Sequence, residues 1–328
     1  MRRRAFLAIL ACLPWAARAG AISNPLLALD ADFRQGIYPG VDGMVVLQRG
    51  KTVFSAAYPA VRPILQGAAG IYNYTDPEWH PVREGLHTLQ SITKTVLAAL
   101  VGIALSRGEL ESVHQSVAPF FPGAGLDPNL TLQELLTMQA GLSWNEDEDW
   151  PAMERSPDWL AYVLAKGREH KRFNYSSGVP ILTASLLEAA TGQSILNYAR
   201  EHLFRPSGID RFLWKKSPTG LADTQGGLYL STADLARFGH RCLGQDAWMQ
   251  ESLQPRAAEE DWRYGYGWWL LPHPEHPGEF VPTALGYGGQ RLFLLPRQGV
   301  VAAFTGWNPG GKGSLPVEKA VEILVASF

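Results

Sequence analysis

A serine and a lysine three residues apart stand at the start of a long apolar segment. The segment Ser91-Ile92-Thr93-Lys94 precedes an uncharged run, residues 95–106, which Arg107-Gly108 ends. That run is long enough for a buried helix and too short to span a membrane. In a helix that begins at Ser91, residues three apart share one face, so the hydroxyl and the amine can meet. A lysine amine in contact with a serine can take its proton and make it a nucleophile.

Ser91 could instead serve only as the N-cap of this helix, since serine is a favoured capping residue. Lys94 favours the catalytic interpretation, because a cation in the first turn opposes the helix dipole by about 0.3–1 kcal/mol. A capping box would place Glu or Gln there, and burial against an apolar helix disfavours a charged amine. Of the eight lysines, only Lys94 has a serine three positions before it. A local rule broken without local gain indicates a functional site.

Two further segments could complete the chemistry of a lysine-activated serine, which needs a proton donor for the leaving group and N–H donors for the oxyanion. Residues 173–178, Phe-Asn-Tyr-Ser-Ser-Gly, place Tyr175 on a turn before a helix, although packing alone could explain a tyrosine there. Residues 286–290, Gly-Tyr-Gly-Gly-Gln, precede a strand. Glycines at such a position allow close backbone approach to a ligand, and the alternative is a simple turn.

Composition limits the class of protein. The chain has 328 residues, 46% hydrophobic and 18% charged, as in a soluble globular protein of one large domain or two intimate ones. A net charge of −2 and the absence of a basic patch argue against nucleic acid as a partner. No Cys/His pair has metal-ligand spacing, and we expect neither a metal nor an organic cofactor. Cys242 lies in a predicted helix at residues 236–243 and is interpreted as a small buried hydrophobe.

Residues 1–21 are predicted to be an export signal. Three arginines at positions 2–4 precede an apolar segment at 5–13 and a small-residue cleavage site at 17–19 or 19–21. Arg3-Arg4-Ala5-Phe6-Leu7 resembles a twin-arginine signal, which implies export after folding to the periplasm or beyond. Cys12 offers a lipoprotein alternative, but the apolar stretch before it is short, so we favour a cleaved signal and no stable membrane insertion afterwards. Removal of four arginines and no acid takes the net charge from −2 to −6.

The hydrophobic pattern is β-like at both ends of the chain and helical in the middle. We expect an α+β fold in which one antiparallel sheet, built from both ends and flanked by N- and C-terminal helices, carries an inserted helical subdomain. The sheet subdomain would comprise residues 22–108 and 223–328, and the helical one residues 109–222. Expected strands lie at 43–55 (a hairpin), 264–271, 291–296 and 299–306, and expected helices at 131–138, 158–165, 179–191, 193–203 and 318–328. Residues 146–149, Glu-Asp-Glu-Asp, are interpreted as a solvated loop, or alternatively as a negative lip that favours cationic substrates.

Taken in order, these motifs resemble the serine β-lactamase and penicillin-binding protein superfamily, in its class C-like branch of esterases, DD-peptidases and aminohexanoate-oligomer hydrolases. Ser91 and Lys94 match the first motif, Ser-x-x-Lys. Residues 175–177, Tyr-Ser-Ser, partly match the second motif, Tyr-x-Asn, and residues 287–289, Tyr-Gly-Gly, match the third, Lys-Thr-Gly or His-x-Gly, in position. The likeness covers about residues 40 to 325.

The resemblance implies a β-lactamase/transpeptidase-like fold and a set of roles. Ser91 would be the nucleophile, Lys94 its base and Tyr175 the proton relay, with the backbone N–H groups of Ser91 and Gln290 as the oxyanion hole. Substrate-binding positions would be Ser177, Tyr287, Gly288 and Gly289.

Two positions depart from the family pattern and bear on the substrate. Ser177 stands where the branch often has an asparagine that bonds a substrate amide, and Tyr287 stands where β-lactamases have a lysine for the substrate carboxylate. We therefore expect an exported serine hydrolase acting on a small-molecule ester or amide. The alternatives are a β-lactamase or DD-carboxypeptidase and, in another class, a non-catalytic periplasmic ligand-binding or sensor protein. The intact Ser/Lys/Tyr set argues against the last.

Overall fold

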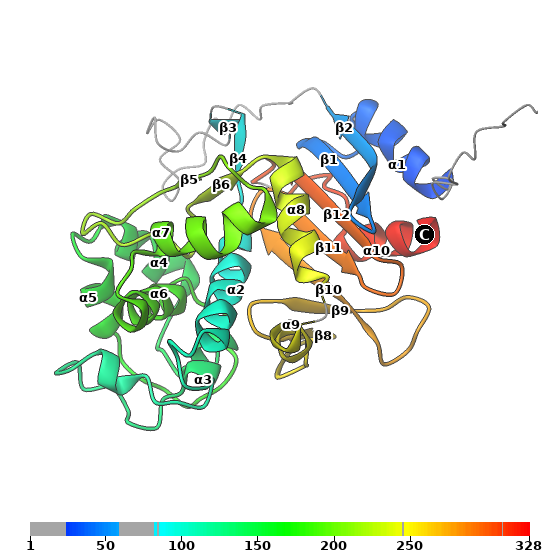
Figure 1. Cartoon of the computed structure of the whole chain (residues 1–328). Coiled ribbons are helices and arrows are strands. Elements are labelled where there is room, and N and C mark those ends of the chain that lie inside the picture. Colours follow the sequence, from blue (N-terminus) through cyan, green and yellow to red (C-terminus); the bar gives the residue numbers. More distant parts are fainter. Residues whose placement is uncertain (1–23, 59–81, 84, 245, 310) are drawn as a thin grey trace, which may run out of the picture.

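The structure is a computed structural model that describes residues 24–58, 82–83, 85–244, 246–309 and 311–328. Its largest element is an eight-stranded antiparallel sheet among these residues, with the strand order β2-β1-β12-β11-β10-β9-β8-β7. Both ends of the chain contribute to it, as predicted (Figure 1). The strands are β1 (Val41–Gln48), β2 (Lys51–Ala57), β7 (Ala257–Glu259), β8 (Trp262–Tyr264), β9 (Trp269–Pro272), β10 (Phe280–Gly286), β11 (Gln290–Leu295) and β12 (Val300–Gly306).

Apolar strands and one tight hairpin fix the register of this sheet. The predicted hairpin turns at Arg49 and Gly50, both with positive φ, so that β1 pairs with β2. Strand β12 lies between β1 and β11, and every one of its residues is buried. A strand that is covered on both faces has no polar side to alternate with, which explains the run of five apolar residues at 300–304.

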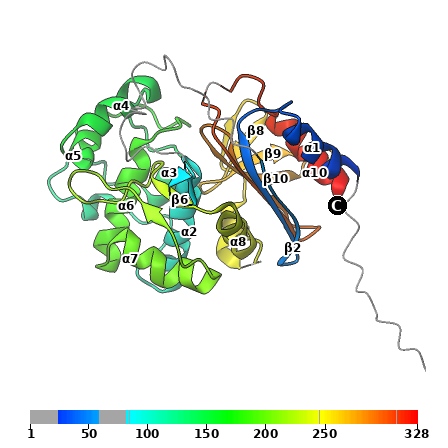
Figure 2. The ribbon, with the colours of Figure 1, turned by 90° about the horizontal axis from the view of Figure 1, so that it is seen from above.

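Helices cover both faces of the sheet, and two apolar clusters follow from this arrangement (Figure 2). Helices α1 (Asn24–Arg34) and α10 (Val317–Ser327) pack together on one face. Helices α2 (Ile92–Ser106) and α8 (Thr232–Cys242) lie on the other face, against β10, β11 and β12. Alternate residues of β11 divide accordingly: Phe293 belongs to the cluster of α1 and α10, while Leu292 and Leu294 belong to the larger cluster around α2.

A second, smaller sheet corrects the prediction of a single sheet. It runs β3-β4-β6-β5, with β3 (Val82–Arg83), β4 (Leu86–Thr88), β5 (Leu213–Trp214) and β6 (Leu228–Leu230). These strands have two or three residues each, too short for a clear period-2 pattern. Their position matters because β4 leads directly into Ser91.

The middle of the chain is mainly helical, and its helices gather beside α2 (Figure 1). It contains α3 (Leu132–Leu136), α4 (Glu146–Arg155), α5 (Trp159–Leu164), α6 (Gly178–Thr191), α7 (Ile195–Ala199) and the turns η2 (Ala118–Phe120), η3 (Arg200–Phe204) and η4 (Arg205–Ser207). The interpretation of residues 146–149 as a solvated loop was wrong. They form the first turn of α4, where negatively charged side chains interact favourably with the helix dipole. Asn145 caps that helix, because its side chain accepts a hydrogen bond from Asp147 N.

Residues 264–271 are not one strand, because the chain leaves the sheet between β8 and β9. Gly265 and Gly267 make this excursion possible: a Cβ on Gly265 would lie 2.0 Å from Ser252 O, and one on Gly267 would lie 2.9 Å from Ala98 Cβ. Gly267 also has a φ of 71°, which favours glycine. A short helix, α9 (Ala247–Ser252), which the sequence pattern did not indicate, packs nearby through Trp248 against Tyr266.

No single helix in the described part of the chain has the length and hydropathy of a membrane span; α6 together with residues 195–207 passes that test only as a pair bent by 76°. The predicted signal at residues 1–21 lies outside the described residues. The division into two subdomains stays a prediction.

Candidate active site

Ser91 stands at the turn between β4 and α2, and it does not cap the helix. The preceding residue, Gln90, has a φ of 49°, a left-handed conformation that is strained for a non-glycine residue. Its side chain donates to Thr88 Oγ1 at 2.9 Å and holds this turn. Ser91 itself is already helical in φ and ψ and makes no side-chain capping bond. Its hydroxyl therefore remains available for chemistry.

Lys94 brings its amine to that hydroxyl, as the spacing predicted. Lys94 is buried, with its Nζ 3.0 Å from Ser91 Oγ, and it donates to the backbone oxygen of Gln225 at 2.7 Å. Threonines on either side fix the helix that carries it: Thr93 Oγ1 accepts from Leu228 N at 3.3 Å, and Thr95 Oγ1 donates to Gly267 O at 2.7 Å. The amine is thus held between the serine and a fixed carbonyl.

Tyr175 reaches the same place from the turn before α6. Lys94 Nζ lies 5.1 Å from the centre of the Tyr175 ring, within the range of a cation–π contact. The indole of Trp269 stacks on the Tyr175 ring, with centroids 5.5 Å apart and planes 26° apart. No hydrogen bond involves the Tyr175 hydroxyl among the described residues, so the phenol can turn to a bound molecule.

Ser177 lies beside Tyr175, but its polar groups are already engaged by Glu146. The Glu146 carboxylate accepts from the Ser177 hydroxyl, from Ser177 N at 2.9 Å and from Trp144 Nε1 at 2.6 Å. Gly178 allows this packing, since a Cβ there would lie 2.7 Å from the Trp144 ring. Glu146 thereby anchors the turn that carries Tyr175, and a role of Ser177 in substrate binding stays a prediction.

The third motif forms the hairpin turn between β10 and β11, next to the turn that carries Ser91. A Cβ on Gly286 would lie only 2.2 Å from Leu89 O, so this strand end touches the backbone just before Ser91. Gln290 is fully buried, and its side chain pairs with both the N–H and the carbonyl of Gly306. Tyr287 is 43% exposed. The turn is therefore rigid at its base and presents one aromatic ring outward.

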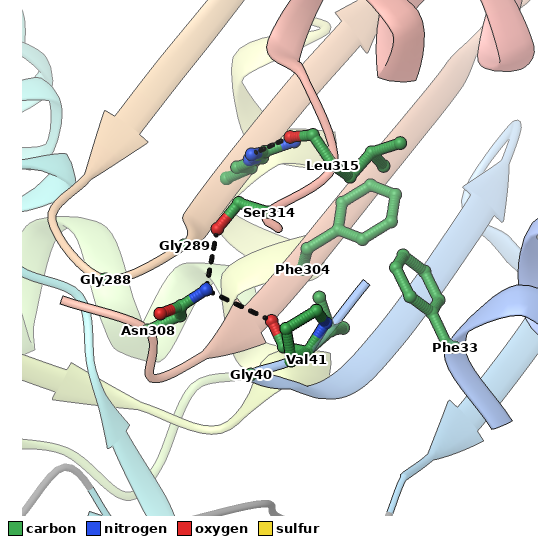
Figure 3. Close-up of a pocket in the computed structure, with 11 residues that line it drawn as sticks. Phe33, Gly40, Val41, Gly288, Gly289, Phe304, Asn308, Ser314 and Leu315 are labelled. Atoms are coloured by element: carbon green, nitrogen blue, oxygen red, sulfur yellow. Dashed lines mark hydrogen bonds between the residues drawn. The ribbon is translucent and has the colours of Figure 1, made fainter. Parts of the chain in front are cut away.

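Figure 3 shows a cavity behind this turn, lined by Gly288, Gly289, Phe304, Asn308 and other residues. Asn308 Nδ2 donates to Ser314 Oγ at 2.9 Å across it, and Asn308 N donates to Gly288 O at 2.8 Å. Its volume of about 10 Å³ is too small for a substrate. The residues that line the cavity support the turn, and the cavity itself is too small for a ligand of drug-like size.

Three polar residues behind Lys94 were not found from the sequence. Gln225, whose carbonyl holds the Lys94 amine, places its side-chain Nε2 3.3 Å from Glu154 Oε1 and 3.4 Å from Asp223 Oδ2. Burial raises the pKa of Glu154 to about 8, and the charge of Asp223 adds to this. Burial likewise raises the pKa of Asp223. These residues lie 60 or more positions from Lys94 in the chain, so no local sequence motif could predict that they lie near it.

Within the described residues, no group of three or more His, Cys, Asp or Glu side chains could hold a metal ion. Cys242 is buried at the end of α8, and burial raises the pKa of its thiol well above the ordinary value. A thiol in this setting behaves as a small hydrophobe, as predicted, and not as a nucleophile.

Comparisons with known proteins identify the family and the fold of the chain. A family model described as Beta-lactamase matches residues 29–315, whereas no match is found among curated proteins. Similar solved structures include a penicillin-binding protein homologue from Caulobacter crescentus (TM-score 0.69, 18% identity, covering 94% of this chain and 99% of that one). Another is a class C beta-lactamase from Rhodobacter sphaeroides (TM-score 0.64, 16% identity, covering 92% of this chain and 97% of that one). A third is a D-stereospecific amidohydrolase from a Streptomyces species (TM-score 0.68, 15% identity, covering 92% of this chain and 98% of that one).

The chain belongs to the Beta-lactamase family, a family of serine hydrolases that includes amidohydrolases, beta-lactamases and penicillin-binding proteins. The predicted resemblance and the predicted fold class are thereby confirmed. At 15–18% identity, the structural neighbours show the fold alone and leave the substrate of this chain to be argued from its own residues.

Proposed function

We propose that this protein is an exported serine hydrolase that cleaves an ester or amide through a covalent acyl-enzyme on Ser91. The observation that carries the proposal is the buried Lys94 amine, 3.0 Å from Ser91 Oγ and anchored on the Gln225 carbonyl. An uncharged amine can donate to that carbonyl and still use its lone pair to accept the serine proton. The strained Gln90 turn aims the hydroxyl away from a capping role.

The reaction would proceed in two halves. Lys94 accepts the proton of Ser91 as Oγ attacks the substrate carbonyl carbon, and the backbone N–H groups of Ser91 and Gln290 stabilise the oxyanion. Among the described residues the Ser91 N–H has no hydrogen-bond partner, which leaves it available for this task. Tyr175 passes a proton to the leaving group, whose bond to the acyl carbon breaks. Water then attacks the acyl-enzyme and releases the acid.

Substrate preference follows from the third motif. Tyr287 replaces the lysine with which related β-lactamases hold a carboxylate, and partial burial raises the pKa of its phenol, so the ring is uncharged near neutral pH. We infer that neutral or cationic acyl esters and amides are preferred over carboxylated lactams, with Gly288 and Gly289 permitting close approach of the acyl group. Export through the twin-arginine route is proposed from residues 1–21 alone.

A substrate panel tests the proposal. Purified mature protein is assayed against p-nitrophenyl esters, aminohexanoyl amides and nitrocefin, with the Ser91→Ala variant as the matched control. We expect ester or amide turnover that Ser91→Ala abolishes without loss of fold. Faster turnover of nitrocefin than of the simple esters would identify a β-lactamase. A complete lack of turnover and of covalent labelling would favour a non-catalytic binding protein.

A further inference from the structure

A charge cluster includes the proposed general base, Lys94, and the reaction as described above does not use its other members. It consists of two acids, the partly buried Glu154 on α4 and the buried Asp223 before β6, and of two lysines, the buried Lys94 and the partly buried Lys215. Gln225 joins its parts: the side-chain amide contacts both carboxyl groups at 3.3 and 3.4 Å, and the backbone carbonyl accepts from the Lys94 amine. An amide NH₂ has two donors, so one residue can satisfy both acids.

The Asp223 carboxyl is closed to water, whereas Glu154 is only partly buried. Asp223 is 1% exposed, accepts from Gly226 N at 3.1 Å, and lies so close to Gly227 that a Cβ there would meet its carboxyl at 2.7 Å. The charges that act on Glu154 are those of Asp223, Lys215 and Arg155, with the Trp150 indole also beside it, and those that act on Asp223 are Lys215 and Lys94. Asp223 is therefore close enough to Lys94 for a charge on either residue to affect the other.

The net charge of the groups around Lys94 determines whether its amine holds a proton. Arg155 is exposed, so solvent screens its charge and it is left out of this balance. If both acids were ionised beside the Lys215 cation, the cluster would carry one net negative charge, which favours a proton on Lys94. If the acids together retain one proton, the remaining charges cancel and Lys94 can stay uncharged, as a general base must. Burial of two carboxyl groups around one amide favours that shared proton, because two close carboxylates resist joint ionisation.

We propose that Glu154 and Asp223 are positioning residues for Lys94: with Gln225 between them they hold one proton, and that proton keeps the base uncharged. The proposal rests on the proposed function only in naming Lys94 as the base. The shared proton is a property of the folded protein whether or not Ser91 reacts, and the two parts can be tested separately.

The proton is tested by stability, in the inactive Ser91→Ala background. The pKa of Glu154 lies near 8 in the folded protein against 4.5 when solvated, so unfolding releases a proton between these values. Stability should then fall as pH rises from about 4.5 to about 8. Glu154→Gln should remove most of this fall in the unfolding temperature, while Glu148→Gln, an exposed change on the same helix, should not. An unchanged pH dependence in Glu154→Gln overturns the shared proton.

The influence on Lys94 is tested by the acid limb of the pH profile of kcat/KM for a p-nitrophenyl ester. Glu154→Gln preserves the cluster charge, so the midpoint of the limb should stay within about 0.3 pH units. Glu154→Gln with Asp223→Asn removes the remaining anion and should lower the midpoint by roughly one unit, and Lys215→Met should raise it.

The directions of these midpoint shifts distinguish an electrostatic effect on Lys94 from a structural effect, which would lower the rate without moving the midpoint. If Glu154→Gln alone lowers the midpoint by about half of the shift seen in the double variant, both acids are ionised in the active enzyme and the proposal is overturned. If Asp223→Asn does not fold, an unmoved limb in Lys215→Met overturns it instead. A stability result as expected, together with no Ser91-dependent turnover, overturns the proposed function and leaves the shared proton standing.

Discussion

Glu146 is predicted to be the anchor of the turn that carries Tyr175, and removing it should cost several kcal/mol. Its carboxylate accepts three hydrogen bonds, from the Ser177 hydroxyl, the Ser177 N–H and the Trp144 indole. Ser177 and Trp144 are only 2% and 7% exposed, so Glu146→Ala leaves their donors in a place that water reaches poorly. Each buried donor left unsatisfied costs about 1–3 kcal/mol. We expect a total loss of about 3–5 kcal/mol, a large part of the roughly 5–15 kcal/mol that stabilises a typical protein.

Urea unfolding at pH 7, followed by tryptophan fluorescence, measures this loss from the midpoint and the slope. Glu148→Ala is the matched control: it removes an exposed acid from the same turn of α4 and should change stability by no more than about 0.5 kcal/mol. Glu146→Gln, which keeps the shape and one acceptor oxygen, should fall between the two. A loss below about 1 kcal/mol in Glu146→Ala, or one equal to the control, would refute the assignment of Glu146 as an anchor.

Three further predictions concern the reaction and the destination of the protein. Tyr175→Phe preserves the ring that stacks on Trp269 but removes the hydroxyl that we propose as the proton relay, so kcat for esters should fall by about 10²–10⁴ with little change in unfolding temperature; a fall below tenfold would remove Tyr175 from the mechanism. Tyr287→Lys restores a cation at the third motif, and a charge-assisted hydrogen bond of about 1.5–3 kcal/mol should raise kcat/KM for nitrocefin relative to a neutral ester by roughly 10- to 100-fold; an unchanged ratio would show that position 287 does not contact the carboxylate. Arg3→Lys with Arg4→Lys should leave precursor in the cytoplasm on cell fractionation, and unchanged export would exclude the twin-arginine route.

Those parts of the molecule that depend on local pattern could be predicted from the sequence. The uncharged run after Lys94 predicted α2, and the residues around Arg49-Gly50 predicted the first hairpin. The Ser-x-x-Lys spacing correctly predicted the contact between the hydroxyl and the amine. The same pattern could not show whether the Ser91 side chain caps the helix or leaves its hydroxyl free of a capping bond. That distinction depends on the backbone of Gln90, whose positive φ no residue type requires.

Features that depend on distant partners could not be predicted. The acidic run at 146–149 looks like a solvated surface, yet Glu146 and Asp149 turn inward to Ser177 and Lys166. The break in the sheet at Gly265 and Gly267 arises because Ser252 and Ala98 approach from elsewhere in the chain. An aromatic-rich segment has the same β-like composition with or without such an approach, so a single strand was the natural but incorrect expectation.

The identity of the nucleophile is the central claim, and covalent labelling tests it most directly. The mature protein and its Ser91→Ala variant are treated with a fluorophosphonate, and intact mass followed by peptide mapping locates the adduct. We predict one adduct per chain, on Ser91, in the unmodified protein and none in Ser91→Ala, whose circular dichroism and unfolding temperature should match those of the parent. An adduct that persists in Ser91→Ala, or that maps to another residue in the parent protein, would contradict the assignment of Ser91 and Lys94 as the catalytic pair.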